Sequence, residues 1–191
     1  MSNDFFALMG RMRNITRWSL MRNTFSENIQ EHSHQVAMLA HGLALIRREI
    51  LHLDGPDPDK CAVAALYHDA TETLTGDMPT PIKYYNPEIK AAYKQVERIA
   101  GERLVAMLPE QLQPFYRPVL LESDKEVETV VKAADKLSAY IKCVEEQKAG
   151  NMEFESAATQ TMVSMKAMNR EELNWFIEEC LPAFSLNLDQ L

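Results

Sequence analysis

The feature that most constrains the fold of this chain is the spacing of its apolar residues. They recur at intervals of three and four along almost the whole sequence, and no run of alternating β-branched residues interrupts them. Such spacing places apolar side chains on one face of an α-helix, whereas a half-buried strand needs strict alternation. The sequence therefore predicts an all-α helical bundle that needs no strand.

Capping residues and prolines divide this pattern into separate helices. Asp57 and Asn86 each precede a proline, which is typical of a helix N-cap followed by a first-turn proline. Ser123 with Glu126 matches the capping-box pattern at the start of another helix. The expected helices are one near the N-terminus and, after a connection over 17–30, an apolar seam over 32–50 and others over about 57–76, 86–109, 123–150 and up to 182, with a proline-rich loop at 77–84.

Composition limits the kind of protein. The 191 residues are expected to form one domain (1–191), because no linker, repeat or low-complexity segment divides them. A net charge of −8 disfavours binding to nucleic acid or to an anionic membrane surface. The longest apolar stretch, 36–46, is too short to cross a bilayer, and the three scattered cysteines are typical of reduced thiols. We therefore expect a cytoplasmic protein with neither a nucleic-acid nor a membrane partner.

A histidine, an aspartate and a glutamate lie close together in the segment HDATE, residues 68–72, which we expect inside an otherwise apolar helix. Ionised carboxylates are costly there unless they are paired, hydrogen-bonded or bound to metal. His68 and Asp69 could reach one divalent cation from neighbouring directions. Glu72 follows on the same helical face and could accept a proton from a water on that ion, or orient the water. On this segment alone, an ordinary hydrogen-bonded His–Asp pair is the simpler interpretation.

Two further residues complete a ligand pattern. His32 heads the apolar seam of an earlier helix, and Asp135 lies within the apolar sequence KAADKLSAY of a later one. A histidine, an adjacent His-Asp pair and a distant aspartate, in this order, resemble the ligand set of the HD-domain metal phosphohydrolases. The resemblance implies an HD-domain helical bundle with one divalent metal ion bound by His32, His68, Asp69 and Asp135. We expect cobalt or manganese, while zinc, copper, nickel, iron and magnesium stay open because imidazole and carboxylate suit several ions.

Longer segments narrow the resemblance. Within the superfamily the chain is similar to the bacterial 5'-deoxynucleotidases, and the similarity extends over nearly all of it. The segments that carry it are RWSLMRN at 17–23, ENIQEHSHQVAM at 27–38, YHDATETLTGDMPTPIKYY at 67–85 and KAADKLSAYIKCVEE at 132–146. The resemblance implies hydrolysis of deoxyribonucleoside 5'-monophosphates to deoxynucleoside and phosphate by a cytoplasmic homodimer with a small-molecule substrate.

The resemblance also implies roles for residues around the metal. Glu72 and Asp69 would be catalytic, and the residues implied to contact substrate are Arg17, Trp18, Asp69, Asp77, Met78, Pro79, Thr80 and Asp135. Two carboxylates neutralise a divalent ion, so a phosphate dianion needs the added guanidinium of Arg17. The indole of Trp18 would orient the phosphate and exclude a ribose 2'-hydroxyl, and Asp77 can accept a hydrogen bond from the sugar 3'-hydroxyl.

Some residues allow a second interpretation. Without the resemblance, Trp18 would be a partly buried core aromatic and Asp77 a turn residue. His34 and His41 lie on a second stripe of the same helix as His32, and either would contact the ion if that stripe faced the site.

The substrate also stays open from the residues alone. Related HD sites would suit a cyclic nucleotide, a deoxynucleoside triphosphate or an alarmone. A triphosphate needs several basic residues, and the loop after the HD segment offers only Lys83. A non-catalytic, metal-containing nucleotide-binding module is the remaining alternative.

Overall fold

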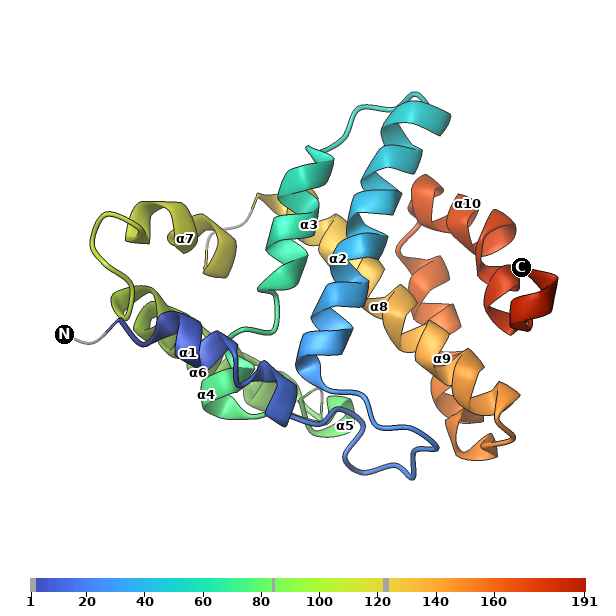
Figure 1. Cartoon of the computed structure of the whole chain (residues 1–191), viewed down its shortest axis with the longest axis horizontal. Coiled ribbons are helices and arrows are strands. Elements are labelled where there is room, and N and C mark those ends of the chain that lie inside the picture. The colour runs from blue at the N-terminus through green and yellow to red at the C-terminus, as the bar shows by residue number, and fades with distance from the viewer. Residues whose placement is uncertain (1–2, 84, 122–123) are drawn as a thin grey trace.

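The computed structural model describes residues 3–83, 85–121 and 124–191, which are built from helices joined by short connections (Figure 1). The α-helices are α1 (Phe5–Met9), α2 (Ile29–Leu45), α3 (Pro58–Leu66), α4 (Glu72–Thr75), α5 (Thr80–Lys83), α6 (Pro87–Ala106), α7 (Gln113–Leu120), α8 (Lys125–Lys148), α9 (Glu155–Ala167) and α10 (Glu171–Glu179). Within these ranges the only β-type pairing is an isolated bridge between Thr16 and Asn28. The all-α prediction is confirmed.

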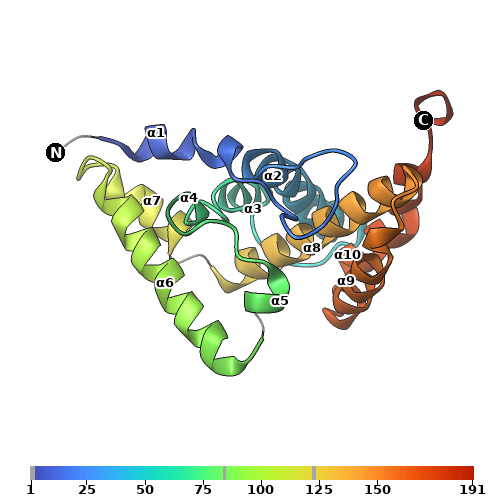
Figure 2. The same cartoon turned by 90° about the horizontal axis from the view of Figure 1, so that it is seen from below.

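The main core lies where α2, α3 and α8 pack together, and α9 and α10 close one side of it (Figure 1). Val36 and Leu43 of α2 and Leu137 and Ile141 of α8 are fully buried in this core. Burial of each such side chain contributes roughly 1.5–3 kcal/mol to the free energy of unfolding. Figure 2 shows α6 and α9 on opposite sides of the molecule, with α4 and α5 between them.

The helix starts that were predicted from capping residues are confirmed for α3 and α6. The Asp57 side chain accepts a hydrogen bond from the Lys60 amide at the start of α3, and Asn86 accepts one from Ile89 at the start of α6. At the start of α8 the N-cap is Asp124, which accepts from the amides of residues 126 and 127. The capping box expected from Ser123 lies outside the described residues.

The helix expected over 57–76 is broken in the middle, and this break corrects the sequence interpretation. α3 ends at Leu66, and α4 begins only at Glu72. Between them the amides of His68, Ala70 and Glu72 donate to the carbonyls three residues earlier, as in a tight turn. The HD pair therefore lies in a turn at the end of α3 and not within a continuous apolar helix.

Three smaller corrections concern helix limits. α2 continues into a π-helical turn, Ile46–Ile50, which rotates the last seam residue outward, so that Ile50 is 47% exposed. Loop 77–84 contains the short helix α5. The final stretch is split into α9 and α10 at Asn169, whose φ of 51° is incompatible with a continuing right-handed helix.

One helix was not expected at all. α7 has a proline in its first turn and Pro118 inside it, and prolines usually indicate the end of a helix. In the described part of the chain, no helix combines the length and the apolar character needed to cross a membrane.

Candidate active site

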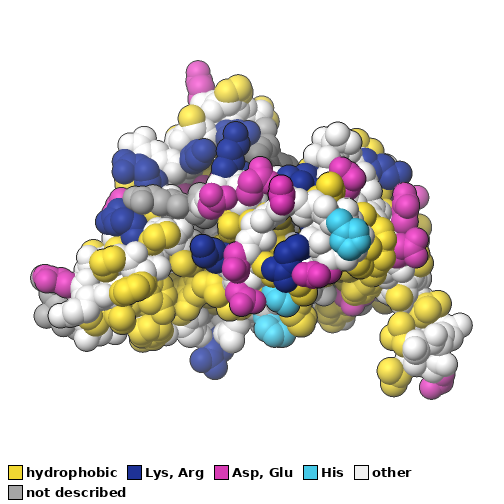
Figure 3. Space-filling view, turned by 90° about the horizontal axis from the view of Figure 1, so that it is seen from above, with side chains coloured by type: hydrophobic (Ala, Val, Ile, Leu, Met, Phe, Trp, Pro, Cys, Tyr) yellow, Lys and Arg dark blue, Asp and Glu magenta, His cyan; other side chains and the backbone are white. Residues whose placement is uncertain are grey.

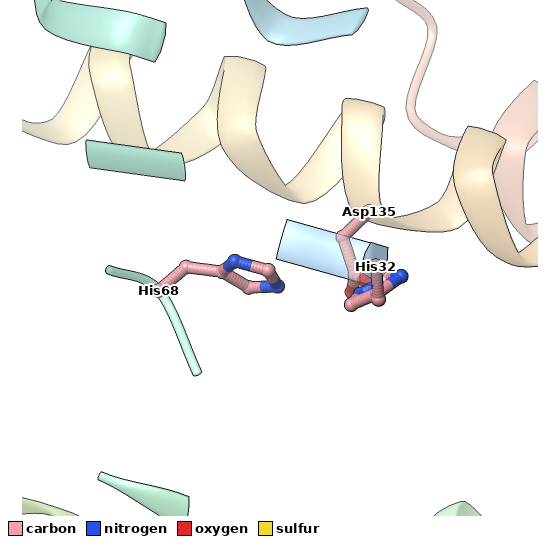
Figure 4. Close-up of side chains that lie close together, drawn as sticks. All are labelled: His32, His68 and Asp135. Carbon is pink, nitrogen blue, oxygen red and sulfur yellow. The ribbon is translucent and has the colours of Figure 1, made fainter. Parts of the chain in front are cut away.

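Three of the four predicted metal ligands converge on one point. His32 comes from the first turn of α2, His68 from the turn after α3, and Asp135 from the middle of α8 (Figure 4). One ligand atom from each lies within 4.8 Å of the others. Among the described residues, this is the cluster of histidine and carboxylate groups that could hold a cation. The crossing of α2 over α8, with α3 packed on both, brings these sequence-distant residues together.

The fourth predicted ligand borders the same point. Asp69 Oδ2 lies 3.2 Å from His68 Nε2 and 3.7 Å from His32 Nε2. The same oxygen is 3.3 Å from Arg17 Nη1, while Asp135 Oδ1 is 3.1 Å from His32 Nε2. Two carboxylates and two imidazoles therefore face one centre with a guanidinium beside it.

Hydrogen bonds on the far side of each ring orient the two histidines. The Ser138 hydroxyl donates to Gln35 Oε1 at 2.6 Å, so it accepts from His32 Nδ1 at 3.1 Å. His68 Nδ1 donates to the Ala65 carbonyl at 2.7 Å. Both Nε2 atoms are thus turned to the centre, and His68 Nε2 has no hydrogen-bond partner among the described residues. Two imidazoles oriented in this way, with two carboxylates, are a donor set that fits a divalent cation.

The charges at this centre are strongly coupled. Burial opposes ionisation of Asp69, but the adjacent His68, His32 and Arg17 hold its pKa well below the usual range. Burial likewise opposes ionisation of Asp135, and its contact with His32 outweighs this and lowers the pKa to about 2. Burial disfavours the charged form of His68, yet Asp69 raises its pKa to about 9 in the metal-free protein. The cluster therefore holds carboxylates that stay ionised at neutral pH.

Glu72 is a buried carboxyl group without a compensating partner. It is the first residue of α4, it is 6% exposed, and its Oε2 has no hydrogen-bond partner in the described part of the structure. Burial, reinforced by the negative charges of Asp69 and Asp77, raises its pKa to about 9. A buried polar group left unsatisfied is costly, and groups of this kind are common at functional sites. Its position beside Asp69 and its raised pKa suit a group that exchanges a proton with a molecule at this centre or orients it.

The connection before α2 supplies the basic and aromatic groups. Arg17 is 14% exposed at its side chain, and its Nε lies 3.3 Å from Glu27 Oε2. Trp18 donates from Nε1 to the same oxygen at 2.9 Å, and its ring packs against Phe154 with a centroid separation of 5.3 Å. The φ of Trp18 is 56°, in the left-handed region that a bulky residue rarely adopts. Such backbone strain is typical of residues held in place for function.

A cavity of about 660 Å³ connects these groups. It is lined by the predicted residues Arg17, Trp18, Asp69, Glu72, Asp77, Met78, Pro79 and Asp135, together with residues that were not predicted: Ser19, Leu20, Met21, Lys83, Lys136, Ala139, Ala157, Gln160, Thr161 and Ser164. The side chain of Thr80, also predicted to bind substrate, lies outside what the structure describes. Burial raises the pKa of Asp77. The size and mixed lining suit a small polar ligand.

Comparison with known proteins identifies the family. A family model described as 5'-deoxynucleotidase YfbR-like matches residues 4–184. The chain belongs to this family. It is 47% identical over 191 residues to the 5'-deoxynucleotidase of Erwinia tasmaniensis, covering 99% of this chain and 96% of that protein. It is 46% identical over 192 residues to the 5'-deoxynucleotidase YfbR of Escherichia coli O1:K1, with the same coverage.

Solved structures agree with an HD-domain fold for this YfbR-like chain. An HD-domain phosphohydrolase from Listeria innocua superimposes with a TM-score of 0.81 at 23% identity, covering 95% of this chain and 88% of that one. The HD phosphohydrolase of cyanophage S-2L, solved with dA and one catalytic Zn2+ ion, gives a TM-score of 0.65 at 19% identity, covering 92% and 95%. The predicted HD-domain fold is confirmed.

In the YfbR-like chain, one residue beside the site was not predicted from the sequence, and two candidate histidines lie away from the site. Glu27 falls in the quoted segment ENIQEHSHQVAM, but only the structure shows that it faces Arg17 and Trp18. His34 is exposed, and His41 lies 3.5 Å from Asp59 on a half-exposed surface. Neither of these two histidines belongs to the converging group.

Proposed function

We propose that this chain is a metal-dependent 5'-deoxynucleotidase that hydrolyses deoxyribonucleoside 5'-monophosphates to deoxynucleoside and phosphate. The observation that carries the proposal is that His32, His68, Asp69 and Asp135 face one centre, and that the two aspartates line a cavity together with Arg17 and Trp18. Relatives 46–47% identical over nearly the whole chain carry this activity in their names, which supports the same reaction here.

The four converging residues would hold one divalent ion. When bound, such an ion would lower the pKa of a water molecule and neutralise charge on the phosphate. We expect cobalt or manganese to support activity. The cyanophage enzyme contains a catalytic Zn2+ ion, so zinc belongs in the same comparison, with copper, nickel, iron and magnesium.

The chain's own residues supply the remaining steps. Glu72, with an unpaired buried oxygen, accepts the proton of the attacking water or orients that water toward phosphorus. Arg17 binds the phosphate. Two carboxylates neutralise the charge of a divalent ion, so the positive charge of Arg17 is needed to attract a phosphate dianion. Trp18 crowds the position of a 2'-hydroxyl, and Asp77 accepts from the 3'-hydroxyl. Asp69 and Asp135 border the phosphate, and Met78, Pro79 and Thr80 lie on the nucleoside side.

The surroundings of the enzyme are part of the proposal. We infer a cytoplasmic homodimer of single-domain subunits that has neither a nucleic-acid nor a membrane partner. On the face drawn in Figure 3, acidic and basic side chains of the described residues are interspersed, and the net charge is −8. A binder of the phosphate backbone would need a concentrated basic surface, so this distribution supports a small-molecule partner.

The deciding experiment measures phosphate release by metal-stripped protein that is resupplied with single divalent ions. The substrates are paired deoxy- and ribonucleoside 5'-monophosphates, with a cyclic nucleotide, a deoxynucleoside triphosphate and an alarmone for comparison. We expect metal-dependent release from the deoxynucleoside monophosphates and at least tenfold slower release from their ribose counterparts. Release from only the comparison substrates would move the assignment to another phosphoester, and release from none would favour a binding module.

A further inference from the structure

One carboxylate oxygen joins the two side chains that the proposed function assigns to phosphate and sugar. Glu27 Oε2 accepts from Trp18 Nε1 at 2.9 Å and from Arg17 Nε at 3.3 Å, and the glutamate side chain is only 10% exposed. We infer that Glu27 is a positioning residue that fixes the indole of Trp18 and the guanidinium of Arg17 together and thereby sets the preference for deoxyribose over ribose. This inference rests on the proposed function.

The direction of the indole N–H depends on this contact, because the other contacts of the ring are apolar. Its ring packs against the buried cluster of Cys143, Phe154 and Ala158 and meets Phe154 at an interplanar angle of 57°. Apolar contacts of this kind are not directional, so they do not fix where the N–H of the ring points. Indole has a single polar hydrogen, and Glu27 accepts it. A charged acceptor makes this bond stronger than a neutral one. Removing the acceptor therefore frees the ring to tilt.

The guanidinium is shared in a similar way. Arg17 gives Nε to Glu27 and Nη1 to Asp69 Oδ2, at 3.3 Å in each case. The planar group is thereby held at two edges beside the metal centre, and its remaining N–H groups are available to phosphate. Glu27 thus determines the plane of the guanidinium as well as that of the indole.

The segment that carries Glu27 is itself anchored to α8. Glu146, fully buried, accepts from the amide of Thr24 at 2.9 Å and from its hydroxyl at 2.8 Å. Lys142, which is ion-paired to Glu146, donates to the carbonyl of Phe25 at 2.7 Å. The bridge between residues 16 and 28 closes the other end of the segment. A rigid segment on both sides makes Glu27 a fixed acceptor rather than a mobile one.

The consequence for specificity follows from the geometry. An indole held in one plane fills the space that a 2'-hydroxyl would occupy and leaves that hydroxyl unpaired, which disfavours ribonucleotides. Glu27→Gln keeps the size of the side chain but replaces one acceptor oxygen with an NH2 donor. The amide carries no charge, so its single oxygen can accept from these two neighbours only through weaker, neutral hydrogen bonds, and we expect the ratio of kcat/KM for deoxy- over ribonucleoside monophosphate to fall about tenfold.

A double-mutant cycle separates this role from general loss of structure. Trp18→Phe removes the indole N–H, so the ratio in the double variant should match that of Trp18→Phe alone. Glu172→Gln is the matched control, because Glu172 is likewise a buried glutamate with two basic or N–H partners, in its case Arg47 and Arg170, and it lies outside the cavity lining. It should leave the ratio unchanged. Additive effects of the Glu27 and Trp18 substitutions on the ratio would overturn the inference.

A second readout needs no turnover. The chain has two tryptophans, so in a Trp175→Phe background the emission reports Trp18 alone. Glu27→Gln should raise acrylamide quenching of Trp18 at least twofold, and unchanged quenching would overturn the inference. Glu27→Asp, one methylene shorter, gives the same readout if the amide variant does not fold. Wild-type enzyme that turns over both sugars equally would refute the role of Trp18 in the proposed function, while quenching would still decide whether Glu27 holds the indole.

Discussion

Glu72 is the residue whose environment departs most from that of an ordinary surface glutamate. Because it is buried beside the proposed metal ligands with one unpaired oxygen, we expect Glu72→Gln to lower kcat about 10²–10⁴-fold without changing metal content. Metal analysis and phosphate release on the same sample test this. Glu88→Gln, at an exposed position in the first turn of α6, is the control. Retained activity in Glu72→Gln would remove this residue from the mechanism.

Glu72 should also lower the free energy of unfolding of the metal-free protein at neutral pH. Its folded-state pKa of about 9 lies above its ordinary value of 4.5, so the folded chain binds a proton that the unfolded chain releases. The free energy of unfolding therefore falls as pH rises from about 4.5 towards 9. At pH 7 we expect metal-free Glu72→Gln to be more stable than wild type by up to about 3 kcal/mol, because one pKa unit is worth about 1.4 kcal/mol.

Denaturant unfolding of both proteins at several pH values measures this difference. The stabilisation should disappear near pH 4, where the glutamate is protonated in both states. A difference that did not grow with pH would show that Glu72 is ionised without cost in the folded protein.

Ser138 orients His32, one of the proposed metal ligands. Its hydroxyl accepts from His32 Nδ1 and donates to Gln35, which keeps Nε2 of the ring turned to the centre. We expect Ser138→Ala to weaken metal affinity about 10–100-fold, as loss of such a supporting hydrogen bond typically does. Titration of metal-stripped protein measures the affinity. Ser33→Ala is the matched control, since Ser33 is also buried but has no hydrogen-bond partner for its hydroxyl among the described residues.

At the scale of elements, a buried ion pair on α8, Lys142 with Glu146, anchors the segment that carries Glu27 by binding the backbone of Thr24 and Phe25. Glu146→Ala leaves Lys142 buried without its carboxylate, so we expect a loss of about 3–5 kcal/mol in the free energy of unfolding. Replacing both residues, with Lys142→Met and Glu146→Leu, should cost much less because no charge remains unpaired. Urea unfolding of the two variants compares them. Equal losses would show that the hydrogen bonds to Thr24, and not the buried charge, dominate.

Helix starts and the family could be predicted because their signals can be read directly from the sequence. An aspartate or asparagine before a proline caps α3 and α6 without help from the rest of the chain. The order of His32, His68, Asp69 and Asp135 pointed to the family, and the family model over 4–184 confirms that prediction.

Other elements could not be predicted because they depend on packing. The break between α3 and α4 replaces helical hydrogen bonds with those of a turn. The position of His68 in that turn depends on how α3 packs against α2 and α8, which the local sequence does not encode. Likewise, one face of α9 lines the cavity beside Lys136 of α8 only because α9 packs along α8. The residues on that face are Gln160, Thr161 and Ser164. Their spacing is that of any helix face, so the sequence could not distinguish them from solvent-exposed residues.

At the scale of the whole molecule, the proposed metal centre joins parts of the chain that are far apart in sequence. Its ligands come from α2, the turn after α3 and α8, so an ion binds the folded chain and has little affinity for the unfolded one. At a free ion concentration 100 times Kd, binding stabilises the protein by about 2.7 kcal/mol. For a chain of this length each kcal/mol shifts Tm by about 2–4 °C, so chelation should lower Tm by roughly 5–10 °C.

His68→Ala distinguishes this effect from a general response to divalent ions. The imidazole that it removes has one hydrogen bond, from Nδ1 to the Ala65 carbonyl, and a charged contact with Asp69, so in the metal-free protein its loss should lower Tm only slightly. The variant should melt near the metal-free wild type and gain almost nothing from added cobalt, manganese or zinc. Calorimetry with and without chelator compares the two proteins. An equal rise of Tm in both would mean that the ions stabilise the acidic surface, with its net charge of −8, and that these three helical segments are not joined through a bound metal.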